Sequence, residues 1–454
     1  MAKKAGLNEY DAVFGGLFSD GYFKGLYIDK VKYTGNLSDN ITRLEWIMRF
    51  NDETLWTSYA SNGTSSGEYD EPSSPQYRAS GVDISIIPGG FESGRWTADQ
   101  NTDWFDCGNW QNLTVPNQNT DVTISTSYAS DDPVISGQTA ECNDLNIESG
   151  IGIDYSSSNI EIHGDLNNQS SSITSTNGTL TFMSDVAASI TSNGQAFDNI
   201  AFNGTGDFII NDEMIINNVL YLTSGVVQTG SNKIYVNNTN SSAIQNHSAS
   251  SYVNGKLRRD VATASYDFPV GDASNYELAN LNINSATGLS YIDVSFEAHS
   301  SPIDISALNL SVDGTPLTSL LDAGFWNIDP DAGMTAIDYD VELNLSGSSN
   351  NAASAAQHTV VKRDDAFADW GLQGTHDNAT QAVKGATGTA NRTSLASFSD
   401  FAIARSNKWV LPIELLDFYA SCDKSDVIIN WTTASEKNSD YFKIQYSENT
   451  KEWR

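Results

Sequence analysis

The chain has 454 residues, with 24 Lys plus Arg against 57 Asp plus Glu, and its formal net charge is -33. This charge disfavours binding to nucleic acid or to an anionic membrane, because both partners need a cationic surface. No run of 18 or more apolar residues is present, so the sequence predicts no insertion into a membrane.

Within residues 1–50, apolar and polar residues alternate from Tyr22 to Tyr33, which predicts strands. The phrase NLSD before ITRLEWIMRF predicts an amphipathic helix that is capped by Ser38 or Asp39. One interpretation of this segment is a small β-hairpin followed by a helix, with no relation to a larger domain. Residues 51–95 are rich in Ser, Gly, Pro and acid, and they predict a linker.

The same first segment also resembles the end of a concanavalin-like (laminin G-like) jelly-roll domain. The resemblance rests on Phe23, Gly25, Ile28, Asp29, Val31, Tyr33, Leu37, Ser38 and Asp39. A jelly roll needs many more strands than this segment supplies. We therefore expect the chain to begin inside a domain whose front lies elsewhere.

Residues 96–250 contain short apolar runs at even spacing, separated by Gly, Asn and Ser. The runs are DVTI, DLNI, IGIDY, NIEIHGDL, TLTFM, ASI, NIAF, FIIN, MIINNVLYL, VVQT and KIYV. Strands of this length in rungs of about 20 residues predict a β-solenoid, in which each rung buries its inward side chains against the next. An antiparallel sandwich is compatible with the same spacing.

Three tryptophans, Trp96, Trp104 and Trp110, precede the first of these strands. They are suited to cap the exposed end of the stack, which would otherwise be an open edge. Alternatively, their rings would form a platform on which a carbohydrate stacks.

The order of phrases from Trp96 onward resembles the repetitive surface proteins that Bacteroidetes-type bacteria export. It rests on the tryptophan block, then DVTI, PVI, CNDLNIESG, GDLNN and VLYLTSGVV, and continues through VNGKLRR and YDFPVGD. Residues 407–454 carry LPIELL, NW-x-TASE and YF-x-I, and they are similar to the fibronectin-like module that precedes the sorting tail of type IX secretion substrates. The resemblance implies a partial fibronectin-like domain there and an extracellular or outer-membrane location.

Residues 251–406 alternate apolar and polar positions in several segments, which predicts an antiparallel β-sandwich with Trp326, Trp370 and Phe401 in its core. The fold class we predict is therefore all-β: a β-solenoid or β-helix-like stack flanked by β-sandwich domains. Cys107 and Cys142 either pair as a disulfide or stay as two free thiols, and Cys422 is the third cysteine.

Catalytic patterns are few. The five histidines are scattered, no nucleophile elbow or phosphate-binding loop occurs, and residues 121–230 contain no lysine or arginine to neutralise an acidic sugar. Oxygen ligands for calcium are more plausible, with Asp329, Asp331, Asp338 and Asp340 as one candidate group, although the spacing of a calcium loop is missing. We expect no other cofactor.

The sequence thus favours a non-catalytic, secreted or cell-surface structural and adhesive protein of a Gram-negative bacterium. Its expected partner is an extracellular polysaccharide or a surface protein. The alternative is a β-helix protein that binds or degrades carbohydrate. Facing clusters of carboxylates or cations along the stack would distinguish the alternative from the first hypothesis.

Overall fold

The computed structural model describes residues 92–112, 114–299, 301–349, 358–377, 381, 387–406, 413–424, 426–436, 447 and 451, together with the backbones of the strands between residues 10 and 77. About 53% of the structure is strand and 3% is helix, so the predicted all-β class is confirmed. The chain forms two compact units, Met1–Asp260 and Val261–Arg454. None of the described helices is long and apolar enough to cross a membrane.

The first strands of unit 1 pair two by two in antiparallel fashion. Strand β1 (Tyr10–Ser19) pairs with β2 (Tyr22–Tyr33), so the alternation in the sequence is confirmed as strand. Strand β5 (Tyr69–Asp70) pairs with β6 (Gln76–Tyr77) inside the predicted linker.

The helix predicted after Asp39 is wrong where the structure describes it. Glu45–Arg49 form strand β3, which pairs with β4 (Trp56–Ala60). The residue types give a physical reason, because aromatic and β-branched residues such as Trp46, Ile47 and Tyr59 favour strands over helices. Ser38 and Asp39, the expected helix caps, lie outside the described residues.

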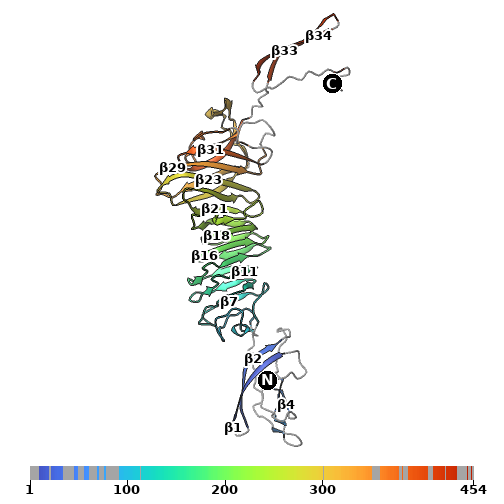
Figure 1. Cartoon of the computed structure of the whole chain (residues 1–454), viewed down its shortest axis with the longest axis vertical. Helices are drawn as coiled ribbons and strands as arrows, with labels where there is room; N and C mark the ends of the chain where they lie inside the picture. Colours follow the sequence, from blue (N-terminus) through green and yellow to red (C-terminus); the bar gives the residue numbers. More distant parts are fainter. Residues whose placement is uncertain are drawn as a thin grey trace. The chain divides into compact units, whose positions relative to one another are not determined.

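A parallel β-solenoid of about eight turns follows, and the prediction of a stack is confirmed. One ladder contains β8 (Thr139–Cys142), β11 (Asn159–Ile162), β14 (Thr179–Phe182), β16 (Ala196–Asn203), β18 (Met214–Ser224) and β20 (Ile244–Gln245). A second contains β7 (Val122–Ile124), β9 (Leu145–Ile147), β12 (Leu166–Asn168), β15 (Ala188–Thr191), β17 (Phe208–Ile210), β19 (Val227–Val236) and β21 (Val253–Asp260). Figure 1 shows β7, β11, β16, β18 and β21 succeeding one another along the stack.

A third parallel ladder contains β10 (Ile153–Asp154) and β13 (Ile173–Thr174), and farther along the stack it is formed by the first residues of β18 and the last residues of β19 and β21. Because β21 continues both ladders, the stack extends to Asp260, ten residues past the boundary that we predicted at residue 250.

The register of the first ladder explains the expected rung length. Ile160, Leu180, Ile200 and Leu220 stand in line, each 20 positions after the one before, and all are buried. In the neighbouring inward column the rings of Phe182 and Phe202 stack with their centroids 5.3 Å apart. The constant spacing in this ladder places apolar side chains on apolar side chains, and this packing excludes water from the interior.

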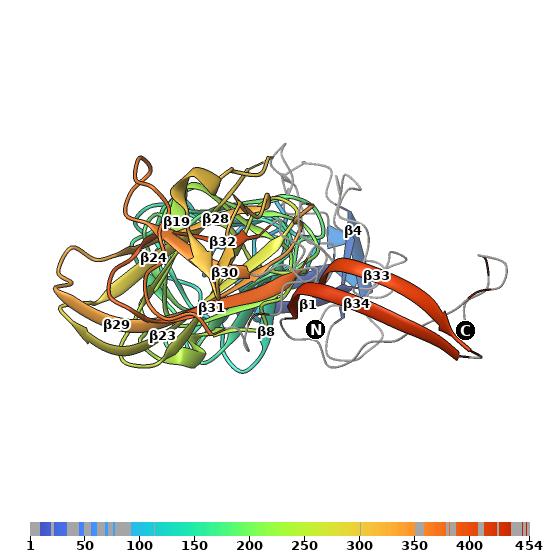
Figure 2. The same ribbon diagram turned by 90° about the horizontal axis from the view of Figure 1, so that it is seen from above.

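Unit 2 contains an antiparallel sandwich. One sheet has the order β22 (Ser265–Gly271), β23 (Tyr276–Thr287), β29 (Ala336–Leu345), β31 (Gly388–Leu395). The other contains β24 (Tyr291–Ala298), β28 (Gly324–Pro330), β32 (Ser399–Arg405) and β30 (His358–Arg363), with the short β27 (Ser319–Leu320) also on β32. Seen from above, β23 and β29 lie side by side, as do β32 and β30 (Figure 2).

The predicted core aromatics of this sandwich are confirmed, since Trp326, Trp370 and Phe401 are all buried. Near the end of the chain β33 (Ile413–Asp423) pairs with β34 (Asp426–Glu436). This hairpin is the described part of the segment that we predicted to be fibronectin-like. Most of the remaining residues of that segment lie outside the described ones, and its domain type stays a prediction.

Candidate functional site

The three tryptophans predicted as a cap or a sugar platform lie together at the start of the stack. Trp104 and Trp110 meet edge to face at 4.7 Å between ring centroids, and Trp96 and Trp110 at 5.1 Å. The indole N–H of Trp96 donates to the carbonyl oxygen of Asp131 over 2.8 Å. All three residues have 0% exposed surface, so they offer no ring face to a sugar, and their packing agrees with the capping alternative.

A buried amide that the sequence analysis did not single out holds this cap in shape. The side-chain oxygen of Asn109 accepts the backbone N–H groups of Gln100 and Asn101, each over 2.9 Å. Its side-chain nitrogen donates to Asn101 and to the carbonyl oxygen of Asp103. Four hydrogen bonds on one fully buried side chain fix the loop between the tryptophans. Sequence offered no signal for it, since asparagine is common throughout the chain.

The cysteines considered for a disulfide are free thiols in the structure. Cys107 is half-buried, and Cys142 is buried in β8. Burial raises the pKa of the Cys142 thiol far above its ordinary value, with the carboxylates of Asp144 and Asp121 adding to the shift. This environment suits an inert core thiol rather than a nucleophile.

Aspartates at one corner of the solenoid connect successive rungs. Asp144 accepts the backbone N–H of Asp165 over 2.8 Å, and Asp165 in turn accepts the N–H of Ser189 over 2.7 Å. Asp121 stands one rung earlier and accepts from Asn143 over 2.7 Å. Because these carboxylates satisfy donors of the next rung, they act as structural links and not as a free acid pair.

Carboxylates also connect rungs at other turns of the stack, to the following rung at Asp132 and to the preceding rung at Asp198 and Asp212. Asp132 accepts the N–H of Gly152, Asp198 that of Asn177 and Asp212 that of Ser192, each over 2.7 to 2.8 Å. These carboxylates are thus engaged by backbone donors.

The acidic segment considered for calcium is engaged in a comparable way. Asp331 accepts the N–H of Ser290 over 2.7 Å, and Asp340 accepts that of Ser394 over 3.0 Å. Within the described part of the chain, no group of three or more His, Cys, Asp or Glu side chains is placed to hold a metal ion. Calcium binding stays a prediction for which the described geometry offers no site.

One surface of the solenoid departs from its acidic character. Between residues 96 and 250 Lys233 is the only lysine or arginine. It stands beside Lys256 in the third ladder, and Tyr235 stands beside Arg258. All four are partly exposed, and we call them the cationic face. The alternation in KIYV and KLRR places these four side chains outward. We considered lysine and arginine only within residues 121–230 of the sequence and therefore did not predict this face.

Carboxylates border the cationic face. Lys233 lies 3.4 Å from Glu213, and the hydroxyl of Tyr235 donates to Asp260 over 2.9 Å. Burial, together with the Asp260 carboxylate, raises the pKa of Tyr235 to about 12. Arg258 lies 5.6 Å from the centre of the Tyr235 ring. The face therefore combines an aromatic ring with three cations and with the two carboxylates, Glu213 and Asp260, that border them.

A loop of unit 2, residues 364–370, presents the most exposed apolar side chain among the described residues. Phe367 is 99% exposed at its tip, and we call this loop the Phe367 turn. The sequence alternation predicted strand through residue 370, but β30 ends at Arg363. The reason is local, because the side chain of Asp365 accepts the N–H groups of Phe367 and Ala368 over 2.8 and 3.0 Å and bends the chain.

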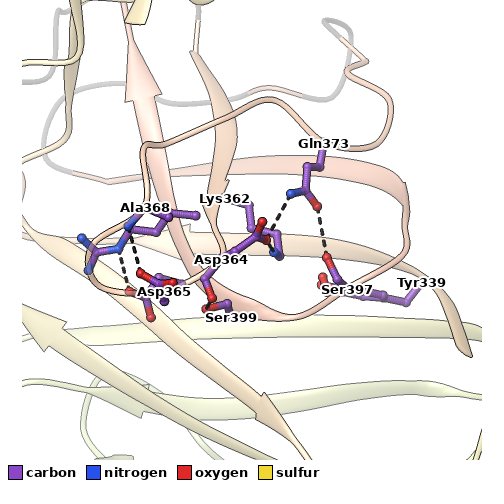
Figure 3. A network of polar contacts seen from close by, with 10 residues as sticks. Tyr339, Lys362, Asp364, Asp365, Ala368, Gln373, Ser397 and Ser399 are labelled. Atoms are coloured by element: carbon purple, nitrogen blue, oxygen red, sulfur yellow. Dashed lines mark hydrogen bonds and ion pairs between the residues drawn. The ribbon is translucent and has the colours of Figure 1, made fainter. Parts of the chain in front are cut away.

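Polar contacts hold the base of this turn (Figure 3). Asp364 forms an ion pair with Lys362, whose side chain is almost fully buried, and this hydrogen bond lowers the pKa of Asp364. Ser399 donates to the Asp364 carbonyl oxygen over 2.9 Å. Gln373 donates to the Asp364 carboxylate over 3.4 Å and accepts from Ser397 over 3.2 Å.

The side chain of Arg363 holds the other side of the Phe367 turn in place. Its guanidinium binds Asp400 over 2.7 Å and lies 4.7 Å from the centre of the Trp370 ring. It also donates to the carbonyl oxygen of Ala366 over 3.3 Å. The turn is thus held in one conformation while Phe367 stays in solvent.

Comparison with protein-family models, with curated proteins and with solved structures gives no match for this chain. Function must therefore be argued from the residues themselves.

Proposed function

We propose that this protein is a secreted or cell-surface structural and adhesive protein, without catalysis, in which the solenoid acts as a rigid acidic support. The observation that carries the proposal is the repeated link from a corner carboxylate to the next rung, seen at Asp144 and Asp165. Side chains that an acid-pair hydrolase would need for chemistry are used here for structure.

The packing of the stack supports the same role. A small void in it is lined by Leu145, Ile160, Leu180 and other core side chains, and its volume of about 10 Å³ is no larger than a water molecule needs. A stack filled in this way transmits force along its length rather than enclosing a ligand. The resemblance to exported Bacteroidetes-type surface proteins supports the extracellular location and a type IX route.

Adhesion requires a partner outside the chain, and the partner we propose is an extracellular polysaccharide or a surface protein. The buried tryptophans remove one candidate platform, so any such contact is made by other outward residues. The alternative is a carbohydrate-degrading protein. It differs in that it would release oligosaccharides, which can be measured directly.

The experiment exposes the purified full chain to a panel of acidic and neutral polysaccharides, with and without calcium, and measures both retention and newly formed reducing ends. We expect no release of oligosaccharide from any polymer. Reproducible release that Asp165→Asn abolishes while the fold is retained would overturn the proposal, because this substitution keeps the hydrogen-bond acceptor but removes the charge.

Location is tested separately. Antibodies raised against residues 92–260 should label intact cells of the organism that encodes the chain. Labelling that requires permeabilised cells would refute the extracellular part of the proposal and leave the structural part standing.

A further inference from the structure

One row of side chains runs along the outer side of the first ladder of the solenoid. It contains one residue from each of five successive strands, which are Glu141 in β8, Glu161 in β11, Thr181 in β14, Ala201 in β16 and Tyr221 in β18. We call these residues the Tyr221 row. Ile160 and Ile162, on either side of Glu161 in the strand, are fully buried, so the row points away from the core, and all five residues are half-buried.

The polar side chains of the Tyr221 row have no partner among the residues that the structure describes. The carboxylates of Glu141 and Glu161 take part in no hydrogen bond or ion pair there, and neither do the hydroxyls of Thr181 and Tyr221. The aspartates at the corners of the stack differ in this respect, because they accept backbone N–H groups of neighbouring rungs.

The two glutamates are unfavourable for the ladder itself. Adjacent strands lie about 4.8 Å apart, so Glu141 and Glu161 place like charges side by side. Glutamate is also among the residues that are depleted in strands. Positions at which a sequence breaks such local rules without a structural gain are expected to serve function.

The residue types of the row suit a carbohydrate. An aromatic ring such as that of Tyr221 packs against the C–H face of a sugar, and Ala201 places no larger side chain between this ring and Thr181. Carboxylates and hydroxyls form strong hydrogen bonds with sugar hydroxyl groups. From Tyr221 to Glu141 the row covers four strand spacings, or about 19 Å, which is the length of a short oligosaccharide segment and not of a single sugar.

Charge restricts the kind of carbohydrate. The row carries two carboxylates, and residues 121–230 contain no lysine or arginine. An acidic polysaccharide would therefore be repelled, whereas a neutral one offers hydroxyl donors to the carboxylates without a charge penalty.

We propose that the Tyr221 row binds a neutral, extended polysaccharide that lies along the stack. One sugar packs against Tyr221, and the hydroxyl groups of the following sugars bind Thr181 and the two glutamates. The strand spacing is close to the length of one hexose in an extended chain, so successive sugars meet successive rungs. This inference rests on the adhesive role proposed above and names the class of its partner.

The position of the two carboxylates favours binding over cleavage. A glycosidase holds its two carboxyl groups on either side of the bond that it breaks. Glu141 and Glu161 project from the same face of one ladder, so both reach a bound polymer from the same side. The site therefore agrees with a protein that holds a polysaccharide without degrading it.

The test is affinity electrophoresis of the full chain in gels that contain one soluble polymer each. Xyloglucan, glucomannan and galactomannan are the neutral probes, and polygalacturonate is the acidic one. We expect at least one neutral polymer to retard wild type and polygalacturonate to leave its mobility unchanged. Tyr221→Ala and, separately, Glu161→Ala should each raise the dissociation constant for the retarding polymer by about tenfold.

Matched controls remove the same kinds of side chain from other places on the stack. Tyr128 is a partly exposed tyrosine outside the row, and Glu213 is a glutamate near the cationic face. Tyr128→Ala and Glu213→Ala should be retarded like wild type. Circular dichroism and the unfolding midpoint show whether each variant is folded.

The outcomes separate this inference from the proposed function. The inference is overturned if no neutral polymer retards wild type, if polygalacturonate retards it equally, or if the Tyr221 and Glu161 variants behave like wild type. In each of these cases a surface protein would still be available as the partner in adhesion. Newly formed reducing ends would instead overturn the absence of catalysis, and weaker binding by the Tyr221→Ala chain would then still place the polymer on this row.

Discussion

Replacing Glu277 by Gln should stabilise unit 2, and the gain should depend on pH. Glu277 in β23 has no exposed surface, and burial raises the pKa of its carboxyl from 4.5 to about 9. The group is therefore protonated in the fold at neutral pH. In the unfolded chain it is ionised, which favours unfolding.

The contacts of Glu277 come from Ser346 and lower its pKa, but they do not offset the effect of burial, and they also suit an amide oxygen. One carboxyl oxygen accepts the N–H of Ser346 over 2.8 Å. The other accepts the Ser346 hydroxyl over 3.3 Å, and this hydroxyl also lies 2.8 Å from the carbonyl oxygen of Tyr276. Glutamine offers the same acceptor and the same donor in nearly the same volume.

The magnitude follows from linkage. A group whose pKa is raised on folding contributes full stability below its unfolded pKa, here 4.5, and loses it as the pH rises toward the folded value of about 9. Each pH unit in this window costs about 1.4 kcal/mol, so at pH 7 the loss amounts to about 3 kcal/mol. Glu277→Gln should recover about that much at pH 7 and nothing at pH 4.

The assay is urea unfolding of the full chain at several pH values, followed by pulsed hydrogen exchange on peptides from β23 and β29. Glu342→Gln is the control, because this glutamate lies on β29 with its side chain exposed and should show no such dependence. If Glu277→Gln changed stability equally at pH 5 and pH 8, the carboxyl would not be neutral in the fold and the reasoning would be refuted.

Three further substitutions test other parts of the structure. Phe202→Ala leaves a cavity between Phe182 and Phe208 and should destabilise unit 1 by about 4 kcal/mol in urea unfolding, whereas an equal effect of the outward Thr181→Ala would contradict the stacked core. Asn109→Ala strands four hydrogen-bond partners and should cost about 3 kcal/mol and expose the tryptophan loop to protease, and unchanged proteolysis would argue against its role. Burial lowers the pKa of His376, so wild type should lose stability relative to His376→Gln as the pH falls from 7 to 5, and parallel pH curves would show that the imidazole is not held neutral.

The rung pattern was predictable because it depends on the order of apolar and turn residues that are close together in the sequence. Apolar residues at positions 160, 180 and 200 recur every 20 residues, and turn residues separate the runs, so a stack could be expected before its contacts were known. Three short strands, β8, β13 and β20, were missed because Thr139–Cys142, Ile173–Thr174 and Ile244–Gln245 carry almost no apolar run. These segments are strands because they pair with strands of the neighbouring rungs, and this pairing sets their register.

Site residues were less predictable, because their roles depend on contacts between distant positions. Nothing in the sequence distinguishes Asn109 from the other asparagines of the chain until its four partners are seen. The tryptophans show the same limit, since the sequence was compatible with a buried cap and with an exposed platform, and only the burial of all three distinguishes the two. The burial of these side chains depends on the packing of the whole rung, and the identity of three residues does not reveal it.

The acidity of the solenoid is compatible with its stability because most of the cost is offset locally. Asp144 and Asp165 occupy adjacent rungs, where strands lie about 4.8 Å apart and like charges repel. Each carboxylate, however, accepts a backbone N–H of the following rung, and a charge-assisted bond of this kind outweighs screened repulsion at the surface. The remaining negative field keeps most surfaces of two copies apart.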